Sequence, residues 1–257
     1  MTETSPAYSV KDLGIDPAVY EKYLGNLRSG RRTHALGSYR PLTKNPSDIP
    51  NGITLRAFFT EETDRALTER LIKHIEGLAT ENGIPIYSGV LWTPHTTIPN
   101  LLYLPETTPG SRVEIFDKVS TDPRTKEVAQ SLEGLFVDFD VLFGGNTIAL
   151  AASRLPTQVL EARRQMTQVA KDLGMGENDY NNILHITLAR MAEDRQSLPN
   201  RNPNSFGRGL MRLHYSLVEQ PLTVQINKTE VMPDLQMVEV HEAPLARAIL
   251  AARSNES

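Results

Sequence analysis

The sequence predicts an α+β fold for this chain of 257 residues. Short apolar runs with strand-like alternation recur along it, and longer segments with helical spacing separate them. The order strand, helix, strand occurs twice, and each time the last strand carries a histidine and a threonine two residues apart. One plan used twice, as an internal duplication would produce, would give the protein two facing half-sites.

The composition excludes several classes of protein. The net charge is only -4, so we expect neither a general nucleic-acid coat nor a membrane-surface binder. The chain has no cysteine, which excludes disulfides, thiolate zinc sites and cysteine nucleophiles. No apolar run approaches the roughly 20 residues of a membrane helix, and the polar N-terminus has no signal-peptide core. We therefore expect a soluble, cytoplasmic protein.

Residues 1–50 are expected to form an N-terminal extension, because prolines interrupt them and they are poorly patterned. The extension could be a solvated segment wrapped over the surface, or an arm that reaches the binding cleft and contacts phosphates. Its basic residues are Arg28, Arg31, Arg32, Arg40 and Lys44. Residues 51–242 are expected to form the main domain, and residues 243–257 a C-terminal helix or tail.

The main domain opens with residues 53–59, an apolar run that predicts a buried strand. Thr60 is the expected N-cap of the next helix, which has acidic residues in its first turn and ends near Gly83. Residues 86–92 and 95–104 have the pattern of two strands, and the second of them begins with a histidine.

The middle of the chain is expected to contain helices and then a hairpin. Residues 112–133 have a helical pattern that breaks at Pro123. Residues 135–143 alternate between apolar and polar side chains, which predicts one strand. The Gly144-Gly145-Asn146 sequence is a tight-turn signal, so residues 147–152 should pair back on that strand.

The last part repeats the pattern of the first. Residues 155–173 form the clearest helix, with a proline at the start and a glycine after the end. Residues 183–190 predict a short buried strand with the second histidine. A predicted helix over 205–218 and two final predicted strands over 222–232 and 236–240 complete the domain.

The two histidine strands carry the pattern most relevant to function. His95 and Thr97 share one strand face, and His185 and Thr187 share one face of the later strand. The aliphatic residue after each threonine points the other way, into the core. We expect the two strands to face each other across one cleft, with both imidazole–hydroxyl pairs inside it.

Chance explains one such pair better than two. The chain has 6 histidines, and roughly one residue in twelve is a threonine, so about half of one His-x-Thr pair is expected by chance. A single strand histidine is usually a hydrogen-bonded core group, and that interpretation stays open for each copy. The other histidines lack the strand and threonine context: His34, His74, His214 and His241.

The residue types fit phosphodiester chemistry. An unperturbed imidazole titrates near pH 6.5, so a neutral ring can accept a proton while a protonated ring donates one. Two rings on opposite sides of a phosphodiester can act as general base and general acid without a metal. Each threonine hydroxyl can donate a hydrogen bond to a non-bridging phosphate oxygen and stabilise its growing charge.

His95-Thr96-Thr97-Ile98 and His185-Ile186-Thr187-Leu188 resemble the paired motifs of the 2H phosphoesterase superfamily. Its members include bacterial RNA 2′,3′-cyclic phosphodiesterases once called 2′-5′ RNA ligases, cyclic nucleotide phosphodiesterases of plants and fungi, and phage enzymes that destroy cyclic oligonucleotide signals. The resemblance covers residues 53–240 in element order and is specific at the two motifs. Residues 1–50 lie outside the usual core.

The resemblance implies a bilobal α+β fold, in which two antiparallel sheets face a central cleft and helices lie outside. It also implies metal-independent phosphodiester hydrolysis with no cofactor. His95 and His185 would be the catalytic pair, and Thr97 and Thr187 the phosphate donors. Which histidine is the acid and which the base depends on the substrate.

Four further residues are candidates for substrate binding. Trp92 lies three residues before the first motif and could stack on a base or belong to the core. Tyr103 and Tyr180 flank the two motifs as weaker stacking candidates. Arg190 could neutralise a substrate phosphate, although its strand parity opposes that of His185, so a structural ion pair is the alternative.

We expect an enzyme that acts on a cyclic phosphate, a short 2′-linked or 2′,3′-cyclic oligonucleotide, or a cyclic nucleotide. A nucleotide-binding module with the same cleft and no turnover is the alternative, and an inert scaffold is a third reading. Long nucleic acid is not expected, because an acidic chain lacks the extended basic groove it requires. No metal, membrane or partner subunit is expected, and a monomer is the default.

Overall fold

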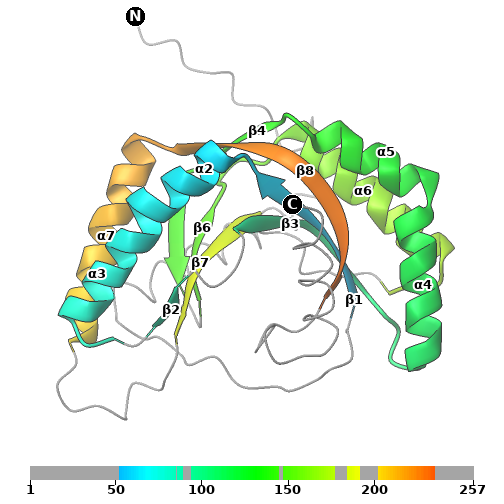
Figure 1. Cartoon of the computed structure of the whole chain (residues 1–257), viewed down its shortest axis with the longest axis horizontal. Helices are drawn as coiled ribbons and strands as arrows, with labels where there is room; N and C mark the ends of the chain where they lie inside the picture. Colours follow the sequence, from blue (N-terminus) through cyan, green and yellow to red (C-terminus); the bar gives the residue numbers. More distant parts are fainter. Residues whose placement is uncertain are drawn as a thin grey trace, which may run out of the picture.

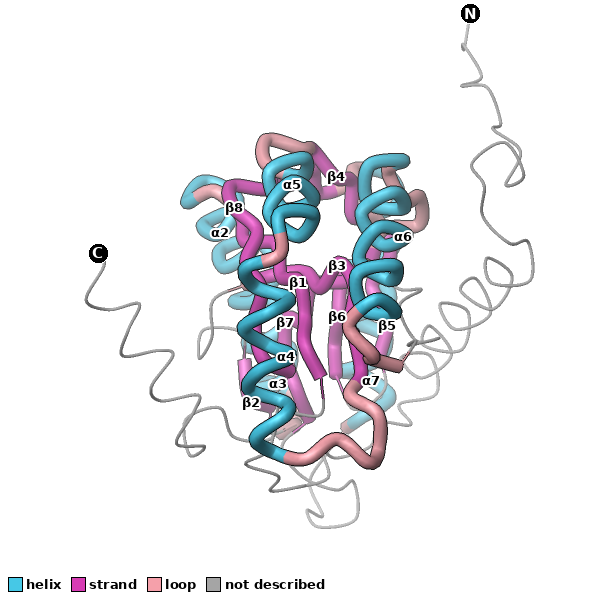
Figure 2. The backbone as a smooth tube through the Cα atoms, turned by 90° about the vertical axis from the view of Figure 1, so that its right-hand side faces the viewer, coloured by secondary structure: helices cyan, strands magenta, loops and turns pink. Residues whose placement is uncertain are grey.

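The structure, a computed structural model, describes residues 52–84, 86–88, 94–144, 147–176, 184–191 and 202–234. Within these ranges a strongly curved sheet has helices along its outer side, with α2, α3 and α7 in one group and α4, α5 and α6 in another (Figures 1 and 2). Several predictions fall outside the described residues: those for residues 1–50, Trp92, Gly145-Asn146, Tyr180, 236–240 and 243–257.

The predicted elements are largely present. The strands are β1 (Gly52–Phe59), β2 (Ile86–Ser88), β3 (His95–Leu102), β4 (Phe136–Phe139), β5 (Val141–Gly144), β6 (Thr147–Ala151), β7 (His185–Met191) and β8 (Leu222–Asp234). The helices are α2 (Glu61–Ala66), the π-helical η1 (Leu67–Ile72), α3 (Lys73–Glu81), α4 (Pro109–Thr121), α5 (Pro123–Leu132), α6 (Thr157–Asp172) and α7 (Pro203–Glu219).

The described strands form a single sheet in the order β4-β8-β1-β3-β7-β6-β5, and β2 pairs with the end of β7. Every pairing between these strands is antiparallel. The predicted mixture of helices and strands is confirmed. The predicted arrangement of two separate, facing sheets is not confirmed, because the pairing of β3 with β7 joins the two halves into one sheet.

The first helix begins where the sequence predicts. The side chain of Thr60 accepts a hydrogen bond from the backbone N–H of Thr63 at 3.4 Å, as an N-cap does. The helical stretch continues through the unpredicted π-helical segment η1 to Glu81. Gly83 follows the C-cap residue Asn82, and its φ of 64° lies in the left-handed region that glycine adopts readily.

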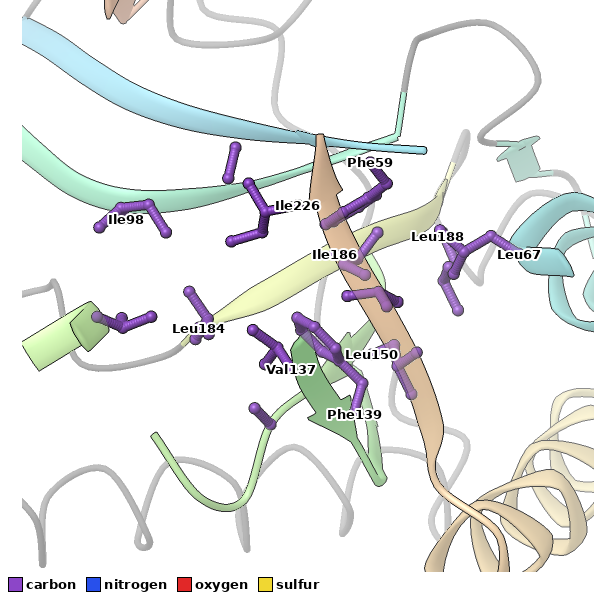
Figure 3. Close-up of a cluster of buried hydrophobic side chains, with 14 of the residues drawn as sticks. Phe59, Leu67, Ile98, Val137, Phe139, Leu150, Leu184, Ile186, Leu188 and Ile226 are labelled. Carbon is purple, nitrogen blue, oxygen red and sulfur yellow. The ribbon is translucent and has the colours of Figure 1, made fainter. Parts of the chain in front are cut away.

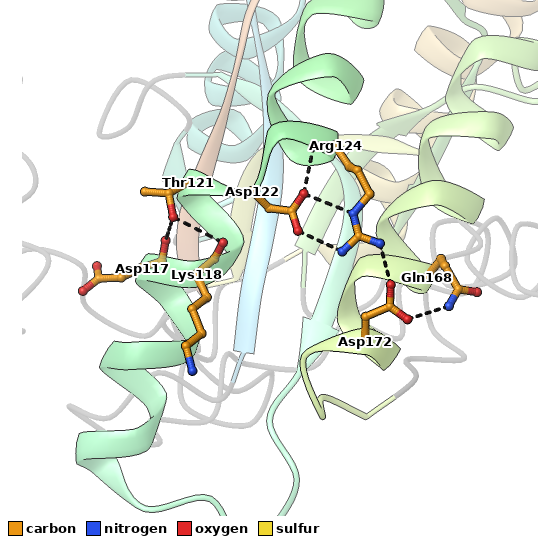
Figure 4. Close-up of polar contacts among 7 residues, drawn as sticks. All are labelled: Asp117, Lys118, Thr121, Asp122, Arg124, Gln168 and Asp172. Carbon is orange, nitrogen blue, oxygen red and sulfur yellow. Dashed lines mark hydrogen bonds and ion pairs between the residues drawn. The ribbon is translucent and has the colours of Figure 1, made fainter.

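The break between α4 and α5 also follows the prediction. Asp122 precedes Pro123, and its carboxylate accepts a hydrogen bond from the Arg124 backbone N–H at 2.8 Å, which caps α5. The Arg124 guanidinium binds Asp122 and also Asp172 at the end of α6 (Figure 4). This exposed network links the C-terminal end of α6 to the start of α5.

One predicted strand is in fact two. The alternating run over residues 135–143 divides at Asp140 into β4, which pairs with β8, and β5, which forms a hairpin with β6. The Asp140 carboxylate accepts hydrogen bonds from the backbone N–H and the hydroxyl of Ser153. These bonds hold the corner at which the chain changes partner, whereas alternation alone shows no break there.

The core lies on the helix-covered face of the sheet. Ile98 of β3 and Ile186 and Leu188 of β7 are each 0% exposed, and Leu188 lies beside Leu67 of η1 (Figure 3). Full burial of such a side chain stabilises the fold by about 1.5–3 kcal/mol. The residues next to each motif histidine and threonine therefore anchor both motif strands.

Candidate active site

The two motif strands lie side by side in the middle of the sheet. β3 and β7 are antiparallel neighbours, with Thr96 registered opposite Ile186. Both side chains are 0% exposed, so this pair points into the core. The prediction that the strands face each other across a cleft is therefore corrected, because both motifs lie on one face of one sheet.

The register brings the four motif side chains together on the face opposite the core. Antiparallel strands run in opposite directions, so the residue before a registered residue on one strand lies across from the residue after its partner on the other strand. His95 is thus across from Thr187, and Thr97 is across from His185. Alternation turns all four side chains away from the core, and all four are partly exposed. We call these four residues the motif quartet.

The motif quartet has its two imidazoles on one diagonal and its two hydroxyls on the other. In a regular antiparallel pair, directly opposed Cβ atoms are about 4.5–5.5 Å apart and diagonal neighbours about 7–8 Å. A tetrahedral group bound at the centre would have an imidazole on each of two opposite sides and a hydroxyl on each of the other two. Rigid neighbouring strands suit such a site, because small misplacements of catalytic groups are costly.

On one side of the quartet, β1 contributes an aromatic and a cationic residue. Phe58 is registered opposite His95, and the two ring centroids are 5.9 Å apart with an interplanar angle of 46°. Arg56 is registered opposite Thr97 and so lies on the same face. The first motif therefore has an aromatic residue opposite its histidine and an arginine residue opposite its threonine.

On the other side of the quartet, β6 contributes only small residues. Ala149 is registered opposite Thr187, and Ala151 is opposite His185. Neither alanine has a side chain beyond Cβ that could reach the centre of the quartet. Of the two strands that flank the quartet, β1 thus supplies the charged and aromatic side chains.

A β-bulge in β7 brings Arg190 onto the quartet face. Ala149 of β6 pairs with Thr187, whereas Thr147, two residues earlier, pairs with Arg190, three residues later. Thr147 and Ala149 share a face, so Arg190 shares the face of Thr187. The predicted opposite parity is corrected, because alternation is counted without the extra residue. Burial lowers the pKa of the Arg190 guanidinium, but the ordinary pKa of arginine is so high that the side chain stays charged at neutral pH.

A bulge at the matching position of β3 does the same for Asn100. Arg56 of β1 pairs with Thr97, whereas Thr54, two residues earlier, pairs with Asn100, three residues later. Asn100 thus occupies the place in the first motif that Arg190 occupies in the second. The match extends the likeness between the two halves beyond the His-x-Thr residues themselves.

An arginine on α6 supports the bulge in β3. Arg163 Nε donates a hydrogen bond to the backbone carbonyl of Ile98 at 2.7 Å. Ile98 directly follows Thr97, at the point where the register of β3 shifts. This contact connects the outer helix to the backbone that carries the first motif.

The aromatic candidates divide differently from the prediction. Tyr103 lies just beyond the end of β3 that is remote from His95, and it is only 8% exposed. Its hydroxyl donates to the Arg112 carbonyl at 3.0 Å, and the Arg112 guanidinium lies 5.3 Å from its ring centroid. The structure therefore does not bring Tyr103 to the motif quartet. Trp92 and Tyr180 are outside the described residues.

The remaining described histidines are apart from the quartet. His74 is exposed on α3. His214 on α7 is 2% exposed, and its Nδ1 accepts a hydrogen bond from the Leu142 backbone N–H at 3.3 Å. Both placements agree with the structural reading given to histidines that lack the motif context.

Sequence reasoning missed Arg56 and Phe58. The signal for Arg56 was present, since a charged residue in the middle of an apolar strand is unusual. Phe58 gave no separate signal, because it continues the apolar run. Which face of β1 each occupies follows from its pairing with β3, which the sequence does not state.

The part of the chain that the structure describes contains neither a metal-binding cluster nor a membrane-spanning helix. No group of three or more histidine, aspartate or glutamate side chains there is arranged to hold a metal ion. None of the described helices combines the length and the apolarity needed to cross a bilayer.

Comparison with known proteins gives little guidance. No protein-family model matches the chain, and no curated protein sequence matches it. One solved structure found by the comparison is E. coli LigT complexed with 3′-AMP. It shares 13% sequence identity with this chain, with a TM-score of 0.34, over 61% of this chain and 81% of LigT.

Proposed function

We propose that this protein is a metal-independent phosphodiesterase in which His95 and His185 are general acid and base. The observation that supports the proposal most is the diagonal arrangement of the motif quartet. The register of β3 and β7 supports it, because His95 and His185 occupy one diagonal of the quartet and Thr97 and Thr187 the other. In an in-line displacement the attacking and departing oxygens lie on opposite sides of phosphorus, so a general base and a general acid must act from opposite sides.

In the proposed reaction, a neutral imidazole removes a proton from water or from a ribose hydroxyl, and the oxygen of that water or hydroxyl attacks phosphorus. The opposite imidazolium gives a proton to the departing oxygen as the P–O bond breaks. Thr97 and Thr187 donate hydrogen bonds to the non-bridging oxygens, whose charge grows in the transition state. The substrate decides which of His95 and His185 is the base.

The proposed substrate is a small nucleotide with a cyclic phosphate, or a short oligonucleotide with a 2′-linked or 2′,3′-cyclic end. Arg190, which the β7 bulge brings to the quartet face, would neutralise part of the phosphate charge. Trp92 and Tyr180 are proposed to stack on a base, a contact that tolerates any base. The buried ring of Tyr103 has no part in this proposal.

The test is a substrate panel of 2′,3′-cyclic nucleotides, 2′-5′ oligonucleotides and cyclic dinucleotides, incubated in EDTA with products identified by mass spectrometry. Turnover that persists in the chelator, and that His95→Ala and His185→Ala each abolish, is the expected result. His74→Ala is the matched control, because that histidine is exposed on an outer helix. Binding of nucleotides without turnover of any panel member would instead make the protein a nucleotide-binding module.

A further inference from the structure

We propose that Arg56 is a substrate-contacting residue, whose guanidinium donates to a non-bridging oxygen of the phosphate held at Thr97. The proposal rests on the proposed function and adds a residue to it. It would make the quartet face cationic next to both threonines, with Arg56 beside the first and Arg190 beside the second.

The position of Arg56 follows from strand register. Arg56 on β1 is directly opposite Thr97 on β3, and opposed residues of an antiparallel pair share a face. Their Cβ atoms are therefore about 4.5–5.5 Å apart in a regular pair. A side chain as long as arginine can reach a phosphate bound by its immediate cross-strand neighbour.

The guanidinium is also held in place by its own strand. Arg56 Nε donates to Thr54 Oγ1 at 3.0 Å, and the Thr54 hydroxyl donates to the Met232 carbonyl of β8 at 3.3 Å. Thr54 is 3% exposed, so its hydroxyl is a fixed acceptor. An arginine oriented in this way loses less entropy when it binds a phosphate than a freely rotating one.

The nearby charges on β8 do not cancel this role. Glu230 is registered opposite Arg56, and Lys228 is opposite Phe58. Lys228 Nζ is 2.8 Å from Glu230 Oε1, so the carboxylate facing Arg56 already has an ammonium partner. Arg56, Lys228 and Glu230 together carry one net positive charge on the β1–β8 side of the quartet.

The experiment compares Arg56→Gln, Arg56→Lys and wild type by steady-state kinetics with 2′,3′-cyclic AMP, and by calorimetric binding of adenosine 2′-monophosphate. We expect kcat/KM of Arg56→Gln to fall about 100-fold, the size of loss typical for one donor to a charged transition-state oxygen. Arg56→Lys should recover part of it, because the charge returns without the planar fork. Nucleotide binding should weaken in the same order.

Two further variants distinguish loss of the Arg56–phosphate contact from an effect of the neighbouring charges and from misfolding. Lys228→Gln/Glu230→Gln removes the neighbouring ion pair of β8 without leaving an unpartnered carboxylate opposite Arg56, and we expect less than about threefold loss. Thr54→Val keeps the volume while removing the hydroxyl that orients Arg56, and it should cause an intermediate loss even if Arg56→Gln does not fold.

The contact is refuted if Arg56→Gln stays within about twofold of wild type in both measurements, or if Lys228→Gln/Glu230→Gln loses as much as Arg56→Gln. Failure of the proposed function gives a different result: wild type would then turn over no substrate, while the binding comparison would still report on Arg56.

Discussion

Thr96 and Thr97 are adjacent threonines for which the structure predicts opposite responses to the same substitution. Thr96 points into the core and is 0% exposed, and its Oγ1 has no hydrogen-bond partner among the described residues. Thr97 points to the motif quartet and is partly exposed. Replacing each by valine removes one hydroxyl and keeps the β-branched shape that strands favour.

The expected stability change for Thr96→Val follows from the unsatisfied hydroxyl. A buried polar group without a partner costs about 1–3 kcal/mol, and valine does not incur this cost. We expect the free energy of unfolding to rise by about 1 kcal/mol, which in a protein of this size raises Tm by about 2–4 °C. Activity should stay within about twofold of wild type, because the side chain faces away from the site.

Thr97→Val should show the reverse. Loss of one donor to the phosphate is expected to lower kcat about 100-fold, with little change in unfolding free energy. Urea denaturation and steady-state kinetics on both variants provide the measurement. A destabilised Thr96→Val, or a fully active Thr97→Val, would refute the assignment of the two side chains to opposite faces.

Three other variants test the fold. Burial raises the pKa of Asp64 to about 6 from its ordinary 3.8, so protonation favours the folded state and stability falls as the pH rises between these two values. Asp64→Asn should therefore be about 1 kcal/mol more stable than wild type above pH 7 and equally stable below pH 4, and this magnitude allows for the partial exposure of the group. Urea denaturation of both proteins at the two pH values measures this difference. Gly52→Ala would put a Cβ 2.1 Å from the Leu101 carbonyl oxygen, so we expect β1 and β3 to separate locally with a loss of about 1–3 kcal/mol or more; a neutral result in thermal melting would contradict that backbone approach. His214→Leu leaves the Leu142 N–H without its acceptor, and calorimetry should show about 1–3 kcal/mol of destabilisation with unchanged kcat/KM.

Local rules explain what could be predicted from the sequence. The period of two along a strand placed each motif histidine with its threonine and turned the intervening residue to the core, as Thr96 and Ile186 show. Helix ends were predictable where a specific residue has a specific role, as Thr60 does at an N-cap. These signals depend on residues within one turn or a few strand positions of each other.

Long-range pairing explains most of what could not be predicted. No local pattern states that β3 and β7 are neighbours, and so the motifs were expected to face each other rather than to share a sheet face. The bulge before Arg190 reverses strand parity through one extra residue, which the sequence does not mark with a glycine or proline. Asp140 likewise ends β4 through its contacts with Ser153, which lies 13 residues later, beyond the β5–β6 hairpin.

The most direct test of convergence on one phosphate is a double-mutant cycle of kcat/KM for His95→Ala, His185→Ala and the double variant. Groups that act together in one proton-transfer step are strongly non-additive, so each single variant should lose at least about 1,000-fold and the double variant should lose little more. Independent losses that multiply in the double variant, or a single variant with near wild-type activity, would show that the two rings do not act on the same phosphorus.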